Sequence, residues 1–187
     1  MKQQIDKIKN WKQFLISEGI NQPQVDVIKD EDLEGVLDVL FGCFGNFFNN
    51  KQQLLEKLKR RIFNGISICL KVNDSIVGVY LLNEKSINDF IDEINKGLIS
   101  DFPKDKTRIS LEENLSDNGI QGIALCVLDE YKGSGYGKIL KDYVDSLGYD
   151  YVWGVQDKDL KNIDFWRKTR KVFAESDTRW ATYKLNN

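Results

Sequence analysis

The segment that decides the fold begins in an apolar run, passes through a glycine-rich loop and continues as an amphipathic helix: Leu125-Cys126-Val127-Leu128-Asp129-Glu130-Tyr131-Lys132-Gly133-Ser134-Gly135-Tyr136-Gly137-Lys138-Ile139-Leu140. A strand, a glycine loop and a helix in this order can hold a phosphate on backbone N–H groups. Glycine lets the ligand approach the backbone closely, and the positive end of the helix dipole lies there. We therefore expect a phosphate-bearing ligand at this loop.

The glycine spacing excludes two common phosphate-binding motifs. A nucleoside-triphosphate loop has four residues between its first glycine and a Gly-Lys-Ser/Thr triplet. Here three residues separate Gly133 from Gly137, and Lys138 is followed by Ile139, which offers no hydroxyl group to magnesium. A dinucleotide loop has the spacing G-x-G-x-x-G after an early strand. This loop reads G-x-G-x-G and stands late in the chain.

Hydrophobic periodicity predicts the elements on both sides of this segment. Strands are expected at 25–28, 66–72, 76–82, 120–128, 151–155, 171–175 and 179–185. Helices are expected at 3–18, at about 30–41 with Asp30 as its cap, at 50–62 with Asn50 as its cap and Gln53 reaching back, at 139–147 before Gly148, and after Asp159 or Asn162. The segment 41–48 is too irregular for a regular element, and is either a loop packed on the core or the wall of a substrate cleft.

A long interruption at 84–118 separates the first hairpin from the central strand. It contains a helix face, formed by Ile87, Phe90, Ile91, Ile94 and Leu98, and then a polar stretch of mixed charge. Connections of this length are uncommon unless they are functional or flexible. We therefore regard 84–118 as the best candidate for substrate selection.

The loop Lys132-Gly133-Ser134-Gly135-Tyr136-Gly137 is a variant of the pattern (Arg/Gln)-x-x-Gly-x-(Gly/Ala). With Leu125-x-Val127 and Tyr131, it resembles the GNAT family (GCN5-related N-acetyltransferases), and the order of elements agrees over about 24–185. The alternative is a coincidental glycine-rich turn. The resemblance implies an α/β (α+β) fold with a mixed, mostly antiparallel sheet flanked by helices. A domain at 23–187 would carry an extra N-terminal helical appendage at 1–22 and the inserted helical segment at about 84–118.

The resemblance also implies a cofactor site, with acetyl-CoA as the acyl donor between the strands at 120–128 and 151–155. Backbone groups of Leu125 and Val127 would pair with the pantetheine arm, and N–H groups of the loop would hold the pyrophosphate. The implied cofactor-binding residues are Leu125, Val127, Lys132, Gly133, Ser134, Gly135, Tyr136, Gly137 and Lys138. Lys132 stands where Arg or Gln is usual, which keeps the charge but loses bidentate geometry.

No catalytic acid or base can be assigned. The strand position where histone-type members carry a glutamate base falls on Gln121, and the helix position of a tyrosine acid falls on Trp166. An amide cannot take up a proton, and an indole N–H is a poor acid. Asp157 or Glu84 could act through water, while the oxyanion would be met by a backbone N–H group near Val127.

Composition narrows the classes of function. The chain has 187 residues and a formal net charge of −2, which gives no broad attraction to nucleic acid or anionic lipid. It has no histidine and no CxxC pair, so we expect no metal site and no Ser-His or Cys-His catalytic pair. Cys43, Cys69 and Cys126 are expected to be buried reduced thiols of a cytoplasmic protein without a membrane span. The late cluster Lys158, Lys161, Arg167, Lys168, Arg170 and Lys171 is either a solvated helix face or a contact for phosphates or an acidic substrate.

Two functions remain. The first is an N-acetyltransferase that moves an acetyl group from acetyl-CoA to a primary amine of a small molecule or a protein by direct attack. The second is a catalytically silent GNAT-fold binding protein, with the N-terminal helix and 84–118 as partner surfaces. A homodimer is left open.

Overall fold

A computed structural model describes residues 22–111, 114–159 and 169–186 of the chain. The helix expected at 3–18 and the helix expected after Asp159 lie outside the described residues, so both stay predictions. The chain divides into two compact units. Unit 1 comprises Met1–Tyr80 and Leu125–Leu140, and unit 2 comprises Leu81–Ala124 and Lys141–Asn187.

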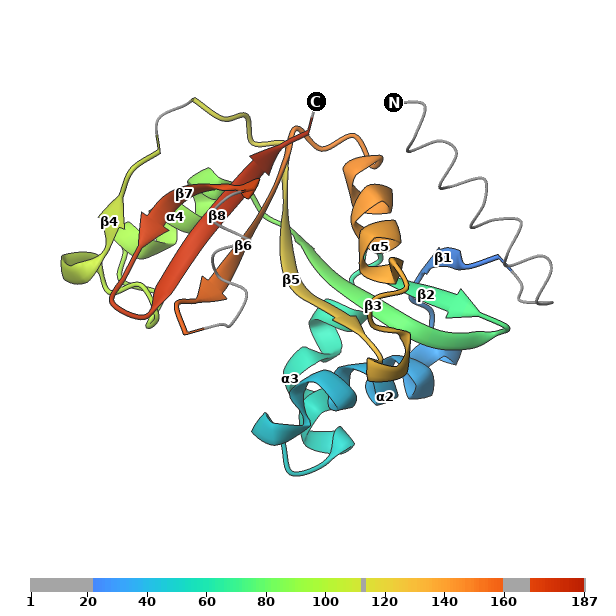
Figure 1. Cartoon of the computed structure of the whole chain (residues 1–187). Coiled ribbons are helices and arrows are strands. Elements are labelled where there is room, and N and C mark those ends of the chain that lie inside the picture. The colour runs from blue at the N-terminus through green and yellow to red at the C-terminus, as the bar shows by residue number, and fades with distance from the viewer. Residues whose placement is uncertain (1–21, 112–113, 160–168, 187) are drawn as a thin grey trace. The chain divides into compact units, whose positions relative to one another are not determined.

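One mixed sheet carries the fold, with the strand order β1-β2-β3-β5-β6-β8-β7-β4 (Figure 1). The strands are β1 (Gln24–Val27), β2 (Ile68–Val72), β3 (Ser75–Glu84), β4 (Arg108–Ile109), β5 (Gly119–Val127), β6 (Tyr151–Asp157), β7 (Lys171–Glu175) and β8 (Arg179–Leu185). The pair β5–β6 is parallel, and β1–β2, β2–β3, β6–β8, β7–β8 and β4–β7 are antiparallel. The expected mostly antiparallel sheet is confirmed. The two-residue strand β4 was not expected, because two residues are too few to show alternation.

In unit 1, the hairpin β2–β3 closes through Asn73 and Asp74. Their φ angles of 50° and 63° are left-handed, as a two-residue hairpin turn requires. Asn and Asp tolerate this conformation better than other non-glycine residues, so the sequence predicts the turn. Helices α2 (Leu33–Phe44) and α3 (Lys51–Ile62) lie on one side of this hairpin, and the first turn of α5 (Tyr136–Asp145) lies on the other (Figure 1).

Two expectations for α2 are wrong. The segment 41–48 is not irregular, because α2 continues to Phe44 and a 3-10 turn follows at Gly45–Phe47. Asp30 is not the cap, since it lies in a 3-10 turn, Asp30–Asp32, that precedes α2. The Asp32 carboxylate instead accepts a hydrogen bond from the Lys29 N–H at 3.0 Å.

The predicted cap of α3 is confirmed. The Asn50 side chain accepts a hydrogen bond from the Gln53 N–H at 2.9 Å, which satisfies one of the free donors of the first turn. The Gln53 side chain reaches back one residue further than expected, to the Asn49 N–H at 2.9 Å. Leu54 and Ile62 are fully buried on the inner face of this helix.

A buried ion pair joins the start of α2 to the sheet in unit 1. Lys71 Nζ lies 2.6 Å from an Asp32 carboxylate oxygen, and the Asp32 side chain is only 5% exposed. Burial opposes ionisation of Asp32, but hydrogen bonds from Lys71 and the Lys29 N–H outweigh it and hold its pKa below the usual 3.8. The pair ties β2 to the turn before α2.

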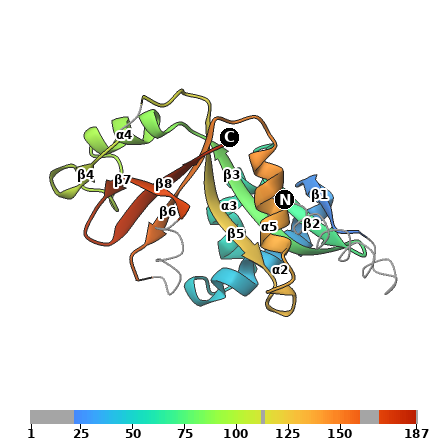
Figure 2. The same cartoon turned by 45° about the horizontal axis from the view of Figure 1, so that its top comes forward.

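In unit 2, the helix α4 (Ile87–Asn95) packs on the sheet strands through an aromatic cluster (Figure 2). The Phe90 ring lies 5.3 Å from Phe102, 4.8 Å from Trp153 and 6.0 Å from Phe173, centroid to centroid. The expected inner face of the segment is confirmed for Ile87, Phe90 and Ile94, but not for Leu98, which is 69% exposed after the helix has ended.

The long connection in unit 2 is held by Tyr151, which is fully buried. Its hydroxyl accepts a hydrogen bond from the Ile87 N–H at 3.0 Å and donates one to the Ser116 carbonyl at 3.0 Å. Trp153 Nε1 donates to the Lys85 carbonyl at 2.6 Å. One strand therefore fixes both ends of the inserted segment.

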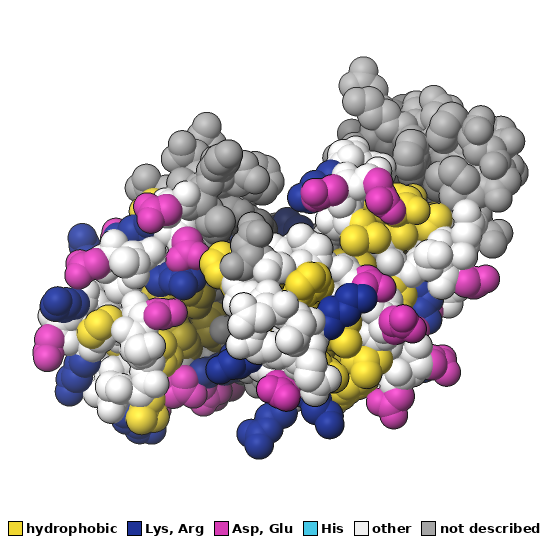
Figure 3. Space-filling model, turned by 90° about the horizontal axis from the view of Figure 1, so that it is seen from below, with side chains coloured by type: hydrophobic (Ala, Val, Ile, Leu, Met, Phe, Trp, Pro, Cys, Tyr) yellow, Lys and Arg dark blue, Asp and Glu magenta, His cyan; other side chains and the backbone are white. Residues whose placement is uncertain are grey.

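The surface shows no field of a single sign on the face drawn in Figure 3, where acidic and basic side chains are interspersed. Such mixing gives no basic patch for a nucleic acid on that face. Within the described ranges, no helix is long and apolar enough to cross a membrane.

Candidate functional site: the glycine loop after β5

The glycine loop in unit 1 links β5 to α5. A 3-10 turn, Asp129–Tyr131, comes first, and Gly133 and Gly135 then take φ angles of 84° and 82°. No atom lies within 4 Å of the place where a Cβ would stand at either glycine. Glycine is therefore favoured at both positions by the left-handed backbone, and not by close packing, because the space beside each glycine is open.

The loop leaves several N–H groups without a protein acceptor. Ser134 N–H donates to the Tyr131 carbonyl at 3.3 Å, and Lys138 N–H donates to the Gly135 carbonyl at 3.0 Å. In the part of the chain that the structure describes, the N–H groups of Gly133, Gly135, Tyr136 and Gly137 have no such partner. Donors of this kind, at the positive end of a helix, form an anion site.

Aromatic and aliphatic side chains fix the base of the loop. Tyr136 is buried and its ring stacks on Tyr131, with centroids 5.9 Å apart and planes inclined at 30°. Burial, together with the nearby Tyr131, raises the pKa of the Tyr136 phenol. A Cβ at Gly137 would lie 3.9 Å from Val127 Cγ2 and 4.0 Å from Leu125 Cδ2. The structure thus brings Leu125 and Val127 together with the loop.

Lys132 forms an ion pair with Asp129, three residues earlier. The hydrogen bond from Lys132 to Asp129 raises the pKa of the ammonium group. Both side chains are exposed, so the pair is weak and a stronger anion can compete for the lysine.

Just before the loop, the edge of β5 that faces away from β3 is not paired with a described strand. The Leu128 N–H donates to the Val77 carbonyl of β3 at 3.0 Å. Successive N–H groups of an extended strand point to opposite edges, so the Val127 N–H points away from β3. The pairing of β5 with β6 covers only Gly119, Ile120 and Gln121 on the β5 side. Within the described ranges, the backbone at Leu125 and Val127 therefore has no strand beside it on that edge.

Cys43 is the residue at this site that the sequence reasoning missed. It was expected to be buried, but it is exposed near the end of α2, whereas Cys69 and Cys126 are buried as expected. Interaction with Cys126, assisted by the charge of Lys132 and by the Val127 backbone, lowers the pKa of Cys43 to about 7. Cys43 lies four residues after the buried Val39 and seven after the buried Val36, a spacing that indicates the inner face of the helix.

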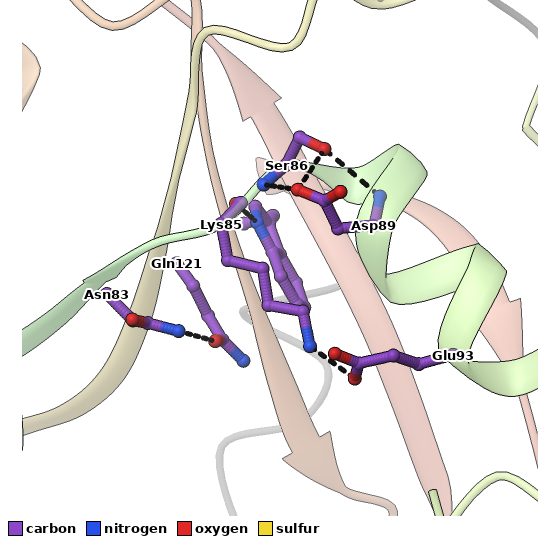
Figure 4. Close-up of polar contacts among 7 residues, drawn as sticks. Asn83, Lys85, Ser86, Asp89, Glu93 and Gln121 are labelled. Carbon is purple, nitrogen blue, oxygen red and sulfur yellow. Dashed lines mark hydrogen bonds and ion pairs between the residues drawn. The ribbon is translucent and has the colours of Figure 1, made fainter. Parts of the chain in front are cut away.

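Gln121, at the expected position of a base, lies in unit 2 next to Asn83 (Figure 4), and Asn83 lines a hollow of about 330 Å³. The Asn83 amide donates to the Gln121 side-chain oxygen at 3.3 Å, so two amides meet at this place. Lys85 forms an ion pair with Glu93 (Figure 4), and both residues line the hollow. The remaining lining residues are Glu84, Asp89, Asp92 and Lys96.

Of the other expected residues, some lie within the described part of the chain and some outside it. Trp166 lies outside the described residues, as do Lys161, Arg167 and Lys168 of the late basic cluster. Lys158 has a structural role in unit 2, because it pairs with Glu175 at 2.7 Å and lies 5.5 Å from the Trp180 ring centroid. Arg170 and Lys171 line a second hollow with Thr169, Tyr183, Lys184 and Leu185.

Comparison of the fold with solved structures gives a consistent result. PaiA N-acetyltransferase from Thermoplasma acidophilum, in complex with coenzyme A, matches with a TM-score of 0.56 and 14% identity over 88% of this chain and 99% of its own. A GNAT-family acetyltransferase from Bacillus cereus matches with a TM-score of 0.59 and 12% identity over 89% and 99%. Ard1 from Thermoplasma volcanium matches with a TM-score of 0.57 and 13% identity over 88% and 98%.

The chain has the GNAT fold. In sequence, no family model and no curated protein matches it. The GNAT assignment therefore rests on structure, and it agrees with the resemblance carried by the loop.

Proposed function

We propose that this chain is an N-acetyltransferase that binds acetyl-CoA at the glycine loop and transfers the acetyl group to a primary amine of a small molecule or a protein. The observation that carries the proposal is the set of N–H groups at the start of α5, those of Gly133, Gly135, Tyr136 and Gly137, that have no protein acceptor among the described residues. A diphosphate matches this set, since it is anionic and offers several acceptor oxygens.

Different groups of the chain would bind different parts of the donor. When bound, acetyl-CoA supplies an activated acyl thioester. The free edge of β5 at Leu125 and Val127 would hold the donor's amide arm, and the loop with Lys132 would hold its phosphates. A backbone N–H near Val127 would stabilise the oxyanion, a role in which the side chain has little influence.

Direct attack requires a neutral amine and a route for its proton. The amine nitrogen attacks the thioester carbonyl, the bond from that carbon to sulfur breaks, and the thiolate leaves with a proton. The Asn83 amide donates a hydrogen bond to Gln121, and neither amide can remove the proton of an amine.

A matched pair of glycine variants tests donor binding. Gly135 has a φ of 82° and Gly148 a φ of 83°, and a Cβ at either would meet no atom within 4 Å. Gly135→Glu and Gly148→Glu therefore add the same charge and the same backbone strain, but only the first lies in the loop. In calorimetric titrations with acetyl-CoA, we expect at least tenfold weaker binding for Gly135→Glu and wild-type binding for Gly148→Glu. Equal effects of the two variants would contradict the proposed site.

Isotope-labelled acetyl-CoA tests transfer. With primary amines or a cell lysate as acceptor, the wild-type chain should label an amine and release CoA, and Gly135→Glu should not. The amide at Gln121 favours one competing function, a GNAT-fold binding protein without catalysis. In that case acetyl-CoA binds but no acceptor is labelled, and Gly135→Glu still captures a stoichiometric partner.

A further inference from the structure

The second hollow of unit 2 has a basic lining and a volume of about 300 Å³, which is at the lower end for small-molecule sites. Three of the side chains that line it are cationic, those of Arg170, Lys171 and Lys184, and none of the described residues that line it is acidic. All of them belong to unit 2, whereas the glycine loop Gly133–Gly137 belongs to unit 1. The hollow is therefore a separate feature from the proposed donor site.

The pairing of β7 with β8 brings these cations together. Lys171, the first residue of β7, stands opposite Tyr183 of β8, and Lys171 Nζ lies 5.9 Å from the centroid of the Tyr183 ring. This distance is within the range of a cation–π contact, which holds the lysine against a buried ring. Arg170 precedes Lys171, and Lys184 follows Tyr183. The register of the two strands thus places three cations at one end of the sheet.

Helix α5 adds a fourth cation near these three. Lys184 Nζ lies 3.1 Å from a carboxylate oxygen of Asp145, at the end of α5 (Figure 1). Lys141 stands one turn before Asp145, and burial, together with the charge of Arg170, lowers the pKa of the Lys141 ammonium group. Asp142 and Asp145 offset two of the four cations. Among the described residues, this leaves an excess of two positive charges.

We propose that this hollow binds a small anion that carries two or more negative charges, of the diphosphate or polycarboxylate class. Like charges held close together repel one another, and a polyvalent anion relieves that repulsion as it binds. Arg170 offers a planar set of donors that can hold two oxygens of one phosphate or carboxylate group. Lys171 and Lys184 add point charges on either side of Tyr183.

The ion pair of Lys184 with Asp145 is compatible with such a ligand. Their side chains are 44% and 29% exposed, so the pair is weak in water and a polyvalent anion can compete for the lysine. Removal of the Asp145 charge should therefore strengthen anion binding, a gain that simple damage to the fold would not produce.

Calorimetric titration with inorganic pyrophosphate tests the site in the full chain. The host is the Gly135→Glu variant, so that the glycine loop does not contribute, and the ionic strength is kept constant. We expect one pyrophosphate to bind per chain and the monovalent anion acetate not to bind. A parallel titration with citrate distinguishes the two ligand classes, since binding of only one of the two polyanions identifies its class. Absence of binding by both, or equal binding of acetate, would overturn the proposal.

Charge variants test whether the hollow is the binding site. Arg170→Gln should weaken anion binding roughly tenfold, and Arg170→Lys should weaken it less, because it keeps the charge but loses the planar donors. The matched control Arg60→Gln removes the same charge from the exposed face of α3 in unit 1, and should bind like the host. Asp145→Asn should bind severalfold more tightly at low salt. Equal weakening by Arg170→Gln and Arg60→Gln would mean attraction to the overall charge and would refute the site.

Lysine protection locates the anion without any substitution. The wild-type chain is labelled with an amine-reactive ester, with and without pyrophosphate, and the labelled lysines are identified by mass spectrometry. We expect severalfold slower labelling of Lys171 and Lys184, and an unchanged rate at Lys57 of α3, all three of which are exposed. Protection confined to Lys132 and Lys138 would place the anion at the glycine loop alone and would contradict the proposal, while leaving the proposed donor site intact.

Discussion

Replacing Gly119 by alanine should destabilise unit 2 strongly, although glycine-to-alanine changes in strands are usually mild. Gly119 of β5 pairs with Tyr151 of β6, whose ring crosses the glycine. A Cβ at Gly119 would stand 2.2 Å from Tyr151 Cε2 and Cζ and 2.5 Å from its hydroxyl oxygen. Ordinary contact begins at about 3.4 Å, so the buried ring must move by more than 1 Å.

The magnitude follows from what that movement disrupts. Overpacking in a well-filled core costs about 1–3 kcal/mol. Displacing the hydroxyl weakens its hydrogen bonds to the Ile87 N–H and the Ser116 carbonyl, each about 1 kcal/mol. We expect Gly119→Ala to lower the free energy of unfolding by about 2–4 kcal/mol and Tm by roughly 5–15 °C. Urea unfolding followed by tryptophan fluorescence measures this difference.

Two controls isolate the contact. Gly97→Ala changes a glycine with a φ of 69° and no atom within 4 Å of its Cβ position, so it should cost only about 1–2 kcal/mol of backbone strain. In a Tyr151→Ala background, Gly119→Ala should cost nothing or stabilise slightly, because the clashing ring is absent. A loss below 1 kcal/mol in the wild-type background, or an equal loss in both backgrounds, would refute the reasoning.

Three further predictions concern unit 1. The Asp32 carboxylate has a lowered pKa in the folded state, so its contribution to the free energy of unfolding is complete above pH 3.8 and is lost as pH falls below that value. Asp32→Asn should lower the free energy of unfolding at pH 7 by about 2–3 kcal/mol. In urea titrations, the variant should also show a flatter fall of that free energy below pH 4 than the wild type. Asp129→Asn should tighten acetyl-CoA binding severalfold at low salt, because it frees the charge of Lys132, and calorimetry at high salt should show no difference. Asn50→Ala should cost about 1 kcal/mol in thermal unfolding, whereas Asn50→Ser keeps a capping oxygen and should cost only a few tenths.

The regular elements were predictable where local chemistry determines them. The left-handed turn at Asn73–Asp74 and the cap at Asn50 depend on residues within four positions, and the strands at 171–175 and 179–185 flank the turn residues Ser176-Asp177-Thr178. The loop Gly133–Gly137 was found for the same reason, because its glycine spacing indicates a particular backbone conformation and needs no distant partner. Rules that depend only on neighbouring residues therefore predicted most of the elements of unit 1 and the closing hairpin.

The rest depends on contacts between distant residues. Leu147 was expected on the inner face of a helix, but α5 ends at Asp145 and Leu147 is 40% exposed. Cys43 has the inner-face spacing of α2, yet it is exposed near the end of that helix, and Cys126 of β5 influences its pKa. No residue near Gly119 in the sequence indicates that the Tyr151 ring packs against this glycine. These features arise only once strands and helices have been placed beside one another.

The double contact of the Tyr151 hydroxyl has an evolutionary consequence. Because Ile87 and Ser116 both bond to one oxygen, the chain between them starts and ends at the same point. The entropy of closing such an excursion grows only with the logarithm of its length, so doubling it costs roughly 0.6 kcal/mol. Beyond α4, this segment can therefore lengthen at a small cost in free energy while the strand that anchors it stays the same.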